Sequence, residues 1–547
     1  MKTLLLNFIT ITFVVSPLCA DGEPGKESVV FVEDGDPKLV VYQGKPWKRC
    51  DGYLQGTRKG NDLYGAKGIG AGDFRLRVRL RILKMTKSAA AFWLGRSYFG
   101  FEGATGKTYI GGPMFGGKTR FLGPSRQFVK GDVWFDFEAI RRGRDVRFLI
   151  DEKEVHQVVF DGRPIGKIGL FPARSVMQVS DFSAEGTIME ISVKSRSYTI
   201  PTIDLADETH RQIVIDRVKG QYLGHPTTVL LEDGKTIIAV YPKGHGRGAI
   251  VMKRSTDAGL TWSERLPTPK SWATSKEVPT IYRVVGPNGV KRLIIFSGLY
   301  PIRLAVSEDD GETWSELEPI GEFGGIVAMA DLVRLKDGRY LTFFHDDGRF
   351  FRKGGRRTGR FHVYQTASND GGLTWGEPNE VAHHSMAHLC EPGVFRSPDG
   401  SQLAMLLREN SRQYNSFVTF SNDEGRTWSE PTELPAALTG DRHQGLYAPD
   451  GRLVISFRDT THVSPTKGDW VAWIGTYEDV VEGRDGQYRV RLMDNHRGAD
   501  CSYPALELLP DGTIVATTYG HWIKGEQPFI VSVRFKIEEI DQKALDF

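Results

Sequence analysis

An eight-residue phrase that the chain repeats four times constrains its fold more than any other feature. The phrase follows the pattern S-x-D-x-G-x-T-W and begins at Ser255, Ser307, Ser368 and Ser421. Successive copies start 52, 61 and 53 residues apart. A repeat of this length predicts a propeller or an array of similar units.

Each repeated position of the phrase has a role in making a turn. The Asp carboxylate can accept backbone N–H groups, and the Gly allows a positive φ that a side chain would penalise. The Trp ring can be buried between neighbouring repeats. We therefore expect the four Asp residues to hold turns and to lie away from any chemistry.

A second repeat consists of an inner strand, a tight turn and a returning strand. Asp-Gly and Asn-Gly pairs are strong hairpin signals, and each of the six segments contains one. The segments begin near His225, Val278, Ile326, Glu391, Gln444 and Tyr503. Six such hairpins predict an all-β fold with a six-bladed β-propeller over residues 210–547.

Residues 21–200 have a different sequence pattern from the repeat region, with short stretches of alternating polarity that predict strands and with Gly-rich turns between them. Phe74 to Ile82 alternates apolar and basic residues, as expected for a sheet with one solvent-exposed face. We predict a jelly-roll-type β-sandwich resembling the laminin-G and concanavalin-like lectin domains. Such a module either binds glycan or braces its neighbour.

The N-terminus reads as an export signal. Lys2 precedes an apolar run from Leu4 to Val15, so residues 1–20 are predicted to be a signal peptide cleaved after about Ala20. No later run is apolar for long enough to span a membrane, so we expect a secreted or periplasmic protein.

Charge and cysteine content exclude several functions. The 547 residues carry a formal net charge of +3, which does not favour nucleic acid as a partner. Cys50, Cys390 and Cys501 would remain after cleavage, and three thiols predict neither a disulfide framework nor a zinc site. We expect no metal and no cofactor.

Residues at equivalent places in the blades should meet at one mouth of the propeller. The first strands line the central channel, so side chains at their entrances, and those after the second strands, gather there. These positions are unusually rich in charge. The candidates are His225, His245, Arg247, Glu277, His345, Asp346, Glu391, Arg408, Asp441, Arg442, His443, Arg458, His462 and Tyr503.

The turn phrases and hairpins resemble the sialidase superfamily, also called BNR-repeat proteins, over roughly residues 215–540. That resemblance implies a retaining glycosidase with a tyrosine nucleophile, an exception to the usual pair of carboxylates. Tyr503, in Cys-Ser-Tyr-Pro, matches the nucleophile, and Glu391, in Leu-Cys-Glu-Pro, matches its base. Arg408 matches a position that is often basic. A neutral phenol avoids bringing a charged nucleophile to a substrate that carries its own carboxylate.

The chain departs from that family where sialidases hold the substrate carboxylate with three arginines. Blade one has His225-Pro226 in place of an Arg-Ile-Pro motif, and Asn415-Ser416-Phe417 replaces the second arginine. Lys243 to Gly248 replaces the family's acid/base aspartate. Arg442 and Arg458 are candidates to complete a clamp, and Asp346 or Glu277 is the candidate acid/base.

The leading hypothesis is a secreted glycoside hydrolase that removes a terminal acidic sugar from a glycan, with sialic acid implied by the resemblance. A second hypothesis keeps the fold but acts on a uronic, neutral or sulfated glycan, as a lyase or a two-carboxylate hydrolase. A third is a non-catalytic glycan-binding propeller.

Overall fold

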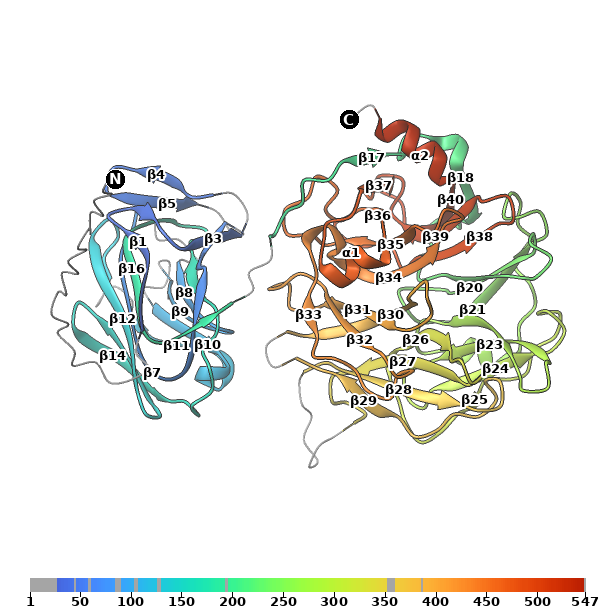
Figure 1. Cartoon of the computed structure of the whole chain (residues 1–547), viewed down its shortest axis with the longest axis horizontal. Coiled ribbons are helices and arrows are strands. Elements are labelled where there is room, and N and C mark those ends of the chain that lie inside the picture. The colour runs from blue at the N-terminus through green and yellow to red at the C-terminus, as the bar shows by residue number, and fades with distance from the viewer. Residues whose placement is uncertain are drawn as a thin grey trace, which may run out of the picture. The chain divides into compact units, whose positions relative to one another are not determined.

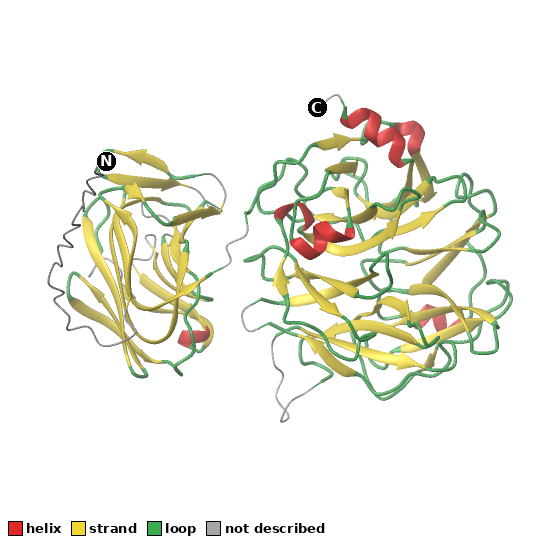
Figure 2. Cartoon of the chain, in the orientation of Figure 1, coloured by secondary structure: helices red, strands yellow, loops and turns green. Residues whose placement is uncertain are grey.

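The computed structural model describes residues 27–43, 46–57, 61–83, 90–102, 107–124, 129–191, 195–351, 360–384 and 387–545. The predicted signal peptide, residues 1–20, lies outside these ranges. The chain forms two compact units, Met1–Ile191 and Ser192–Phe547. Strands dominate both units, and the few helices are short (Figure 2).

The first unit is a sandwich of two antiparallel sheets, as predicted (Figure 1). One sheet runs β14 (Lys153–Val159), β13 (Asp145–Ile150), β12 (Trp134–Arg142), β7 (Lys67–Ile82), β16 (Val176–Glu190), β1 (Glu27–Glu33) and β2 (Asp36–Pro37), with β5 (Tyr53–Thr57) on β16 and β4 (Lys48–Cys50) on β5. The other runs β11 (Gly117–Pro124), β10 (Lys107–Gly112), β9 (Ser97–Glu102), β8 (Ala91–Leu94), β15 (Ile168–Phe171), β6 (Asp62–Gly65) and β3 (Val40–Gln43).

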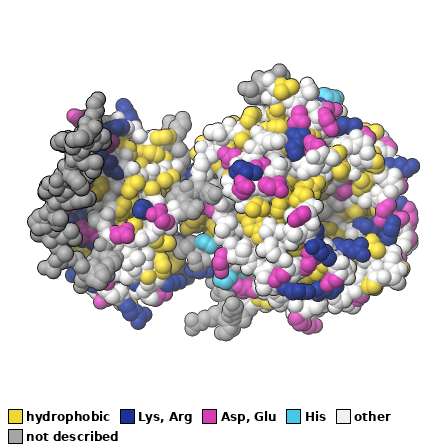
Figure 3. Space-filling model, in the orientation of Figure 1, with side chains coloured by type: hydrophobic (Ala, Val, Ile, Leu, Met, Phe, Trp, Pro, Cys, Tyr) yellow, Lys and Arg dark blue, Asp and Glu magenta, His cyan; other side chains and the backbone are white. Residues whose placement is uncertain are grey.

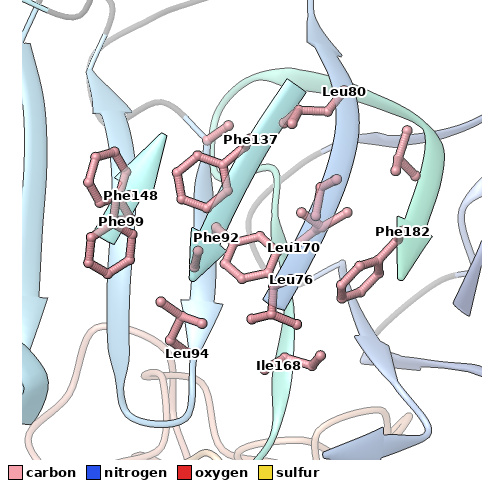
Figure 4. Close-up of a cluster of buried hydrophobic side chains, with 14 of the residues drawn as sticks. Leu76, Leu80, Phe92, Leu94, Phe99, Phe137, Phe148, Ile168, Leu170 and Phe182 are labelled. Carbon is pink, nitrogen blue, oxygen red and sulfur yellow. The ribbon is translucent and has the colours of Figure 1, made fainter. Parts of the chain in front are cut away.

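The alternation in Phe74 to Ile82 sets the two faces of the first sheet. The apolar residues of this stretch are buried, while the arginines between them face outward. Arg75 pairs with Glu138 at 2.9 Å, and Arg79 pairs with Asp136 at 3.0 Å. The buried face packs against aromatic and aliphatic side chains of both sheets, including Phe92, Phe99, Phe137, Phe148 and Phe182 (Figure 4).

The second unit is a six-bladed β-propeller, as predicted, and its blades contain β19–β21, β22–β25, β26–β29, β30–β33, β34–β37 and β38–β40 in chain order. The first two blades contain β19 (Thr227–Leu230), β20 (Ile237–Pro242), β21 (Ile250–Ser255), β22 (Thr280–Val285), β23 (Lys291–Ser297), β24 (Arg303–Ser307) and β25 (Glu318–Pro319). The next two contain β26 (Ile326–Arg334), β27 (Tyr340–Asp346), β28 (His362–Ser368), β29 (Asn379–Ala382), β30 (Leu389–Arg396), β31 (Leu403–Glu409), β32 (Phe417–Ser421) and β33 (Thr432–Glu433). The last two contain β34 (Gly440–Tyr447), β35 (Leu453–Asp459), β36 (Trp470–Gly475), β37 (Tyr488–Met493), β38 (Ala505–Leu508), β39 (Ile514–Gly520) and β40 (Phe529–Phe535).

The beginning of this unit closes the ring. β18 (Gln212–Asp216) pairs antiparallel with β40 and supplies the outer strand of the sixth blade. β17 (Thr202–Asp204) pairs in parallel with β37, so the fifth blade has five strands. Strand pairing of the propeller therefore already starts at Thr202, before the predicted boundary at residue 210. Two short helices, α1 (Tyr477–Glu482) and α2 (Ile537–Ala544), complete the unit.

The four turn phrases form the same hydrogen-bonded turn. In the second copy, Asp309 accepts hydrogen bonds from the Ser307 hydroxyl at 2.8 Å, the Thr313 amide at 2.9 Å and the Thr313 hydroxyl at 2.5 Å. The Gly311 amide donates to the Ser307 hydroxyl at 2.8 Å. Asp257, Asp370 and Asp423 make the same contacts. This confirms that the repeated Asp residues hold turns.

Within the described ranges, no helix is long and apolar enough to cross a membrane. On the face shown in Figure 3, basic and acidic side chains of the propeller lie interspersed with apolar ones.

Candidate functional site

The entrances of the inner strands share an unusual backbone conformation. His225, Val327, Glu391, Arg442 and Ser502 have φ values between 48° and 58°, in five different blades. Residues other than Gly rarely adopt positive φ values, and such strained residues are common at functional sites that require a particular side-chain orientation. The register shifts of β26, β30 and β34 fall at the same place, as β-bulges do when they redirect a strand.

These entrances surround a cavity of about 260 Å³. Its lining comes from all blades except the fifth, and it combines carboxylates, a phenol, imidazoles and an amide. The lining residues are His225, His245, Gly246, Glu277, Val278, Ile326, Val327, His345, Phe361, Cys390, Glu391, Asn410 and Tyr503. We call this cavity the mouth pocket.

Tyr503 and Glu391 form a direct pair in the mouth pocket. The Tyr503 hydroxyl donates to Glu391 Oε1 at 2.5 Å, and both side chains are buried. Burial disfavours the Glu391 carboxylate, but the Arg408 guanidinium 2.5 Å away and the Tyr503 hydrogen bond together keep the pKa of Glu391 below its ordinary value. Burial and the Glu391 charge raise the pKa of Tyr503 well above its ordinary value. The resting pair is thus a neutral phenol on an ionised carboxylate.

Glu277 is a second carboxyl group in the same pocket, and its pKa is shifted in the opposite direction. Its Oε2 accepts a hydrogen bond from the Val327 amide at 3.2 Å. Burial raises the pKa of Glu277 to about 7, with a smaller contribution from the charge of Glu391. Two carboxyl groups with separated pKa values are the arrangement that lets one act as an acid while the other stays charged.

The buried imidazoles of the pocket are held by neighbours and are neutral. The His225 ring lies 4.2 Å from the Tyr503 ring, accepts the Gly246 amide at Nδ1, and contacts the Tyr519 hydroxyl with Nε2. Burial lowers the pKa of His225 well below its ordinary value and that of His345 to about 4.

His245 is more exposed than the other pocket imidazoles. It contacts the Tyr222 hydroxyl at 2.6 Å, and that hydroxyl also donates to Asp500 at 2.7 Å.

Two of the predicted substrate-binding arginines, Arg408 and Arg458, converge with Arg412 on one carboxylate, Asp441, whose side chain is fully buried. Arg408, Arg412 and Arg458 lie 3.1, 2.6 and 3.3 Å from it. Burial disfavours its charge, but the three guanidinium groups hold the pKa of Asp441 well below its ordinary value. Arg442 lines a different cavity, of about 160 Å³, with Tyr282 and Glu507. Arg408, Arg442 and Arg458 are not among the lining residues of the mouth pocket, but they border its reacting pair. Arg408 contacts Glu391, and the guanidinium groups of Arg442 and Arg458 lie 5.9 and 5.7 Å from the centre of the Tyr503 ring.

Four other predicted site residues also lie outside the pocket lining. Asp346 turns its carboxylate to the amides of Gly348, Phe350 and Phe351, as a turn residue does. Arg247 is exposed.

The other two are histidines that contact backbone carbonyl groups. His443 Nε2 lies 2.9 Å from the Leu438 carbonyl oxygen, and His462 Nε2 lies 3.1 Å from that of Tyr414. Of the predicted residues, the pocket brings together Tyr503, Glu391, Glu277, His225, His245 and His345.

Asn410, Phe361 and Cys390 line the pocket but were not among the predicted site residues. Asn410 follows Arg408 at the end of the second strand of blade four, and its Oδ1 accepts from Arg408 at 2.7 Å. Its position alone could have identified it, since Arg408 was chosen by the same rule. Phe361 and Cys390 are apolar neighbours of His362 and Glu391, and their type carries no signal for a site.

A possible metal-binding group among the described residues consists of His362, Glu380 and His383. Their ligand atoms lie within 4.8 Å of one another. Both imidazoles contact the same carboxylate oxygen, at 3.0 and 2.9 Å. These residues do not line the mouth pocket.

Comparison with known proteins supports the repeat assignment. Residues 307–516 match the model of the BNR repeat-like domain, and this stretch contains three of the four turn phrases. The chain therefore carries a BNR-repeat six-bladed propeller. Comparison with curated protein sequences finds no significant match.

Several solved structures resemble the chain distantly. A protein of unknown function from Dyadobacter fermentans is 18% identical, with a TM-score of 0.48, over 59% of this chain and 97% of that one. A point mutant of NanB sialidase from Streptococcus pneumoniae is 12% identical, with a TM-score of 0.41, over 86% and 96%. A leech intramolecular trans-sialidase is 14% identical, with a TM-score of 0.42, over 89% and 99%.

Proposed function

We propose that the chain is a glycoside hydrolase that removes a terminal sugar from a glycan in the mouth pocket, with retention of configuration. The observation that carries this proposal is the 2.5 Å hydrogen bond from Tyr503 to an ionised Glu391. A phenol on a buried carboxylate can transfer its proton as it attacks, which is how a weak nucleophile is activated. Glu277, with a pKa of about 7, supplies the acid that a leaving sugar needs.

The residues divide the reaction into two displacements. In the first, Tyr503 Oη attacks the anomeric carbon, Glu391 takes the phenol proton, and Glu277 protonates the leaving oxygen. In the second, Glu277 accepts a proton from water as that water displaces the phenol, and Glu391 returns the proton to Tyr503. Two inversions give net retention.

The non-catalytic alternative fits the pocket less well. A binding site needs stacking aromatics and few titratable groups, whereas this pocket buries two carboxyl groups with different pKa values beside a phenol. Burying such groups costs free energy, and carboxyl groups with strongly shifted pKa values cluster at functional sites. This proposal does not include the acidic sugar that the resemblance implies, because binding an acidic sugar requires cations in the pocket.

The test is sugar release from a pool of sialylated and unsialylated glycans by the wild type and by Tyr503→Phe. We expect the wild type to release a terminal monosaccharide and Tyr503→Phe to lose at least about 10²-fold in kcat. Unchanged release by Tyr503→Phe would contradict the tyrosine nucleophile. A wild type that releases nothing from any glycan would contradict the hydrolase.

We also propose that the chain is exported and loses residues 1–20. The sequence of Lys2 and the apolar run from Leu4 to Val15 supports this proposal. N-terminal sequencing of the protein from its native host should find a new terminus near Asp21. A terminus at Met1 would contradict it.

A further inference from the structure

The Asp441 carboxylate lies among three guanidinium groups, where a bound anion could otherwise lie. It is fully buried, and Arg412 holds it with both terminal nitrogens, at 2.6 and 2.7 Å. Arg408 Nε and Arg458 Nη1 approach it at 3.1 and 3.3 Å. Three guanidinium groups around one carboxylate form the kind of clamp that binds a substrate carboxylate, but here the carboxylate belongs to the chain.

The two arginines nearest the reacting pair have few donors left for a ligand. Arg408 donates to Glu391 through Nη1 and to Asn410 through Nη2, while its Nε faces Asp441. Arg458 donates its Nε–H to the Cys501 carbonyl at 2.7 Å and directs Nη1 at Asp441. Their charges are balanced mainly by Asp441 and Glu391.

Neither Lys nor Arg is among the described lining residues of the mouth pocket, and the guanidinium groups that border it contact Glu391 or the Tyr503 ring. Its buried imidazoles, His225 and His345, are neutral at neutral pH, and Glu391 is ionised. A substrate carboxylate would be brought beside Glu391 in a water-poor space, where like charges repel strongly. Asn410 and His345 instead offer uncharged polar groups of the kind that bind hydroxyls.

We propose that the pocket takes a neutral sugar, one whose anomeric carbon and neighbouring carbons carry no carboxylate, and that Asp441 permanently fills the anion position of the arginine clamp. This inference rests on the proposed hydrolase for its reaction, but binding tests it independently. It replaces the acidic sugar implied by the resemblance with a neutral aldose, such as a hexose, a 6-deoxyhexose or an N-acetylhexosamine.

The first arm of the test compares substrates on the wild type. Matched 4-methylumbelliferyl glycosides of neutral sugars, sialic acid and glucuronic acid would be assayed together. We expect kcat/KM for at least one neutral glycoside to exceed that of both acidic glycosides by about 100-fold or more, since like charges in a water-poor pocket repel strongly. Equal or faster release of sialic or glucuronic acid would overturn the inference while supporting the hydrolase.

The second arm measures binding and needs no turnover. Free neutral monosaccharides and N-acetylneuraminic acid would be titrated into wild-type protein by NMR or calorimetry. If no substrate is cleaved, binding of a neutral sugar alone would sustain the inference and contradict only the hydrolase. Tighter binding of N-acetylneuraminic acid, or binding of neither class, would overturn the inference.

The third arm releases the clamp. Asp441→Asn removes the resident charge, and we expect it to raise affinity for N-acetylneuraminic acid at least about tenfold over the wild type, because the freed guanidinium groups can bind its carboxylate. Asp459→Asn is the matched control, because Asp459 is equally buried in the same blade but pairs with Arg489 at 3.2 Å. A gain in both variants, or in neither when circular dichroism shows that Asp441→Asn is folded, would contradict the role of Asp441. If that variant does not fold, the first two arms decide.

Discussion

The propeller repeats two features, the outer turn phrases and the inner-strand entrances, and it uses them in opposite ways. The turn phrases repeat side chains, so that Asp257, Asp309, Asp370 and Asp423 make the same contacts four times. The entrances repeat a backbone conformation and change the side chain, with a positive φ at His225, Val327, Glu391, Arg442 and Ser502. One repeat builds the scaffold, and the other places different chemical groups at the starts of the inner strands, of which His225, Val327 and Glu391 line the mouth pocket.

This difference separates the two kinds of carboxylate in the molecule. A turn carboxylate lies at the surface and is satisfied by hydroxyls and amides of its own phrase. Of the pocket carboxyl groups, Glu391 is buried and Glu277 is half-buried; both face groups from other blades, and they differ from each other in pKa. Substitution should therefore affect stability at the turns and the reaction rate at the entrances.

Glu391→Gln should have the largest effect on the rate. The amide cannot take the Tyr503 proton, so we expect kcat to fall about 10³-fold, within the range of general-base catalysis. Glu507→Gln is the matched control, since Glu507 is a half-buried inner-strand carboxyl in the other cavity, and its substitution should leave kcat nearly unchanged. Steady-state kinetics of the two variants, on whichever glycan the wild type cleaves, decide the matter. Equal losses in both would show that any inner-strand carboxyl supports the fold and that Glu391 has no special role.

Glu277 should set the alkaline limb of the pH profile. The acid must be protonated, and its pKa is about 7, so we expect kcat to be highest below pH 7 and to fall about tenfold per pH unit above it. Glu277→Gln should lower kcat about 10²-fold and abolish that limb. It should lose much less activity on aryl glycosides, because good leaving groups need little protonation. A limb that persists unchanged in Glu277→Gln would assign the acid to another group.

The scaffold could be predicted from the sequence because its signals are local. The turn phrase encodes its own contacts within eight residues, and each Asp-Gly or Asn-Gly pair encodes a hairpin, so the six blades followed directly. Thr202 to Asp204 gave no such signal. Its pairing with β37 is a contact between residues far apart in the chain, and only the folded ring brings them together.

For the site, the sequence predicted only a set of candidate residues at equivalent positions of the blades, and not which of them line the pocket. His345 and Asp346 are adjacent on a strand, so their side chains point to opposite faces, and only His345 reaches the pocket. That rule was applicable to the sequence and would have excluded Asp346. Which arginines meet Asp441 depends on contacts between blades four and five, which neither spacing nor composition encodes.

Asp309→Ala should affect stability and leave the reaction unchanged. The variant loses three hydrogen bonds in an exposed turn, so we expect the free energy of unfolding to fall by about 1–2 kcal/mol, with kcat unaltered. The Thr313 hydroxyl and amide lower the pKa of Asp309 from 3.8 to about 2. Its contribution is therefore fully present above pH 3.8 and is lost as pH falls through about 2. Urea denaturation of the wild type and the variant between about pH 2 and 7 should show the difference shrinking only at the acid end. A difference that grows toward acid pH would contradict the assigned contacts.

Ala258→Gly should have the smallest effect, and it tests whether the two repeats share backbone strain. The residue before the repeated Gly of the phrase has a positive φ in all four copies, at Ala258, Asp310, Gly371 and Glu424. Only the third copy uses Gly there. Replacing Ala258, whose φ is 61°, with Gly should relieve strain and raise the free energy of unfolding by less than about 1 kcal/mol, since the lost methyl group partly offsets the gain. The reverse change, Gly371→Ala, should lower it, because the new Cβ would lie 2.5 Å from the Gly286 Cα. Urea denaturation of both variants measures these opposite changes in the free energy of unfolding. A loss of stability in Ala258→Gly would mean that the methyl contact outweighs the strain, and that the turn phrase, unlike the entrances, is not a strained position.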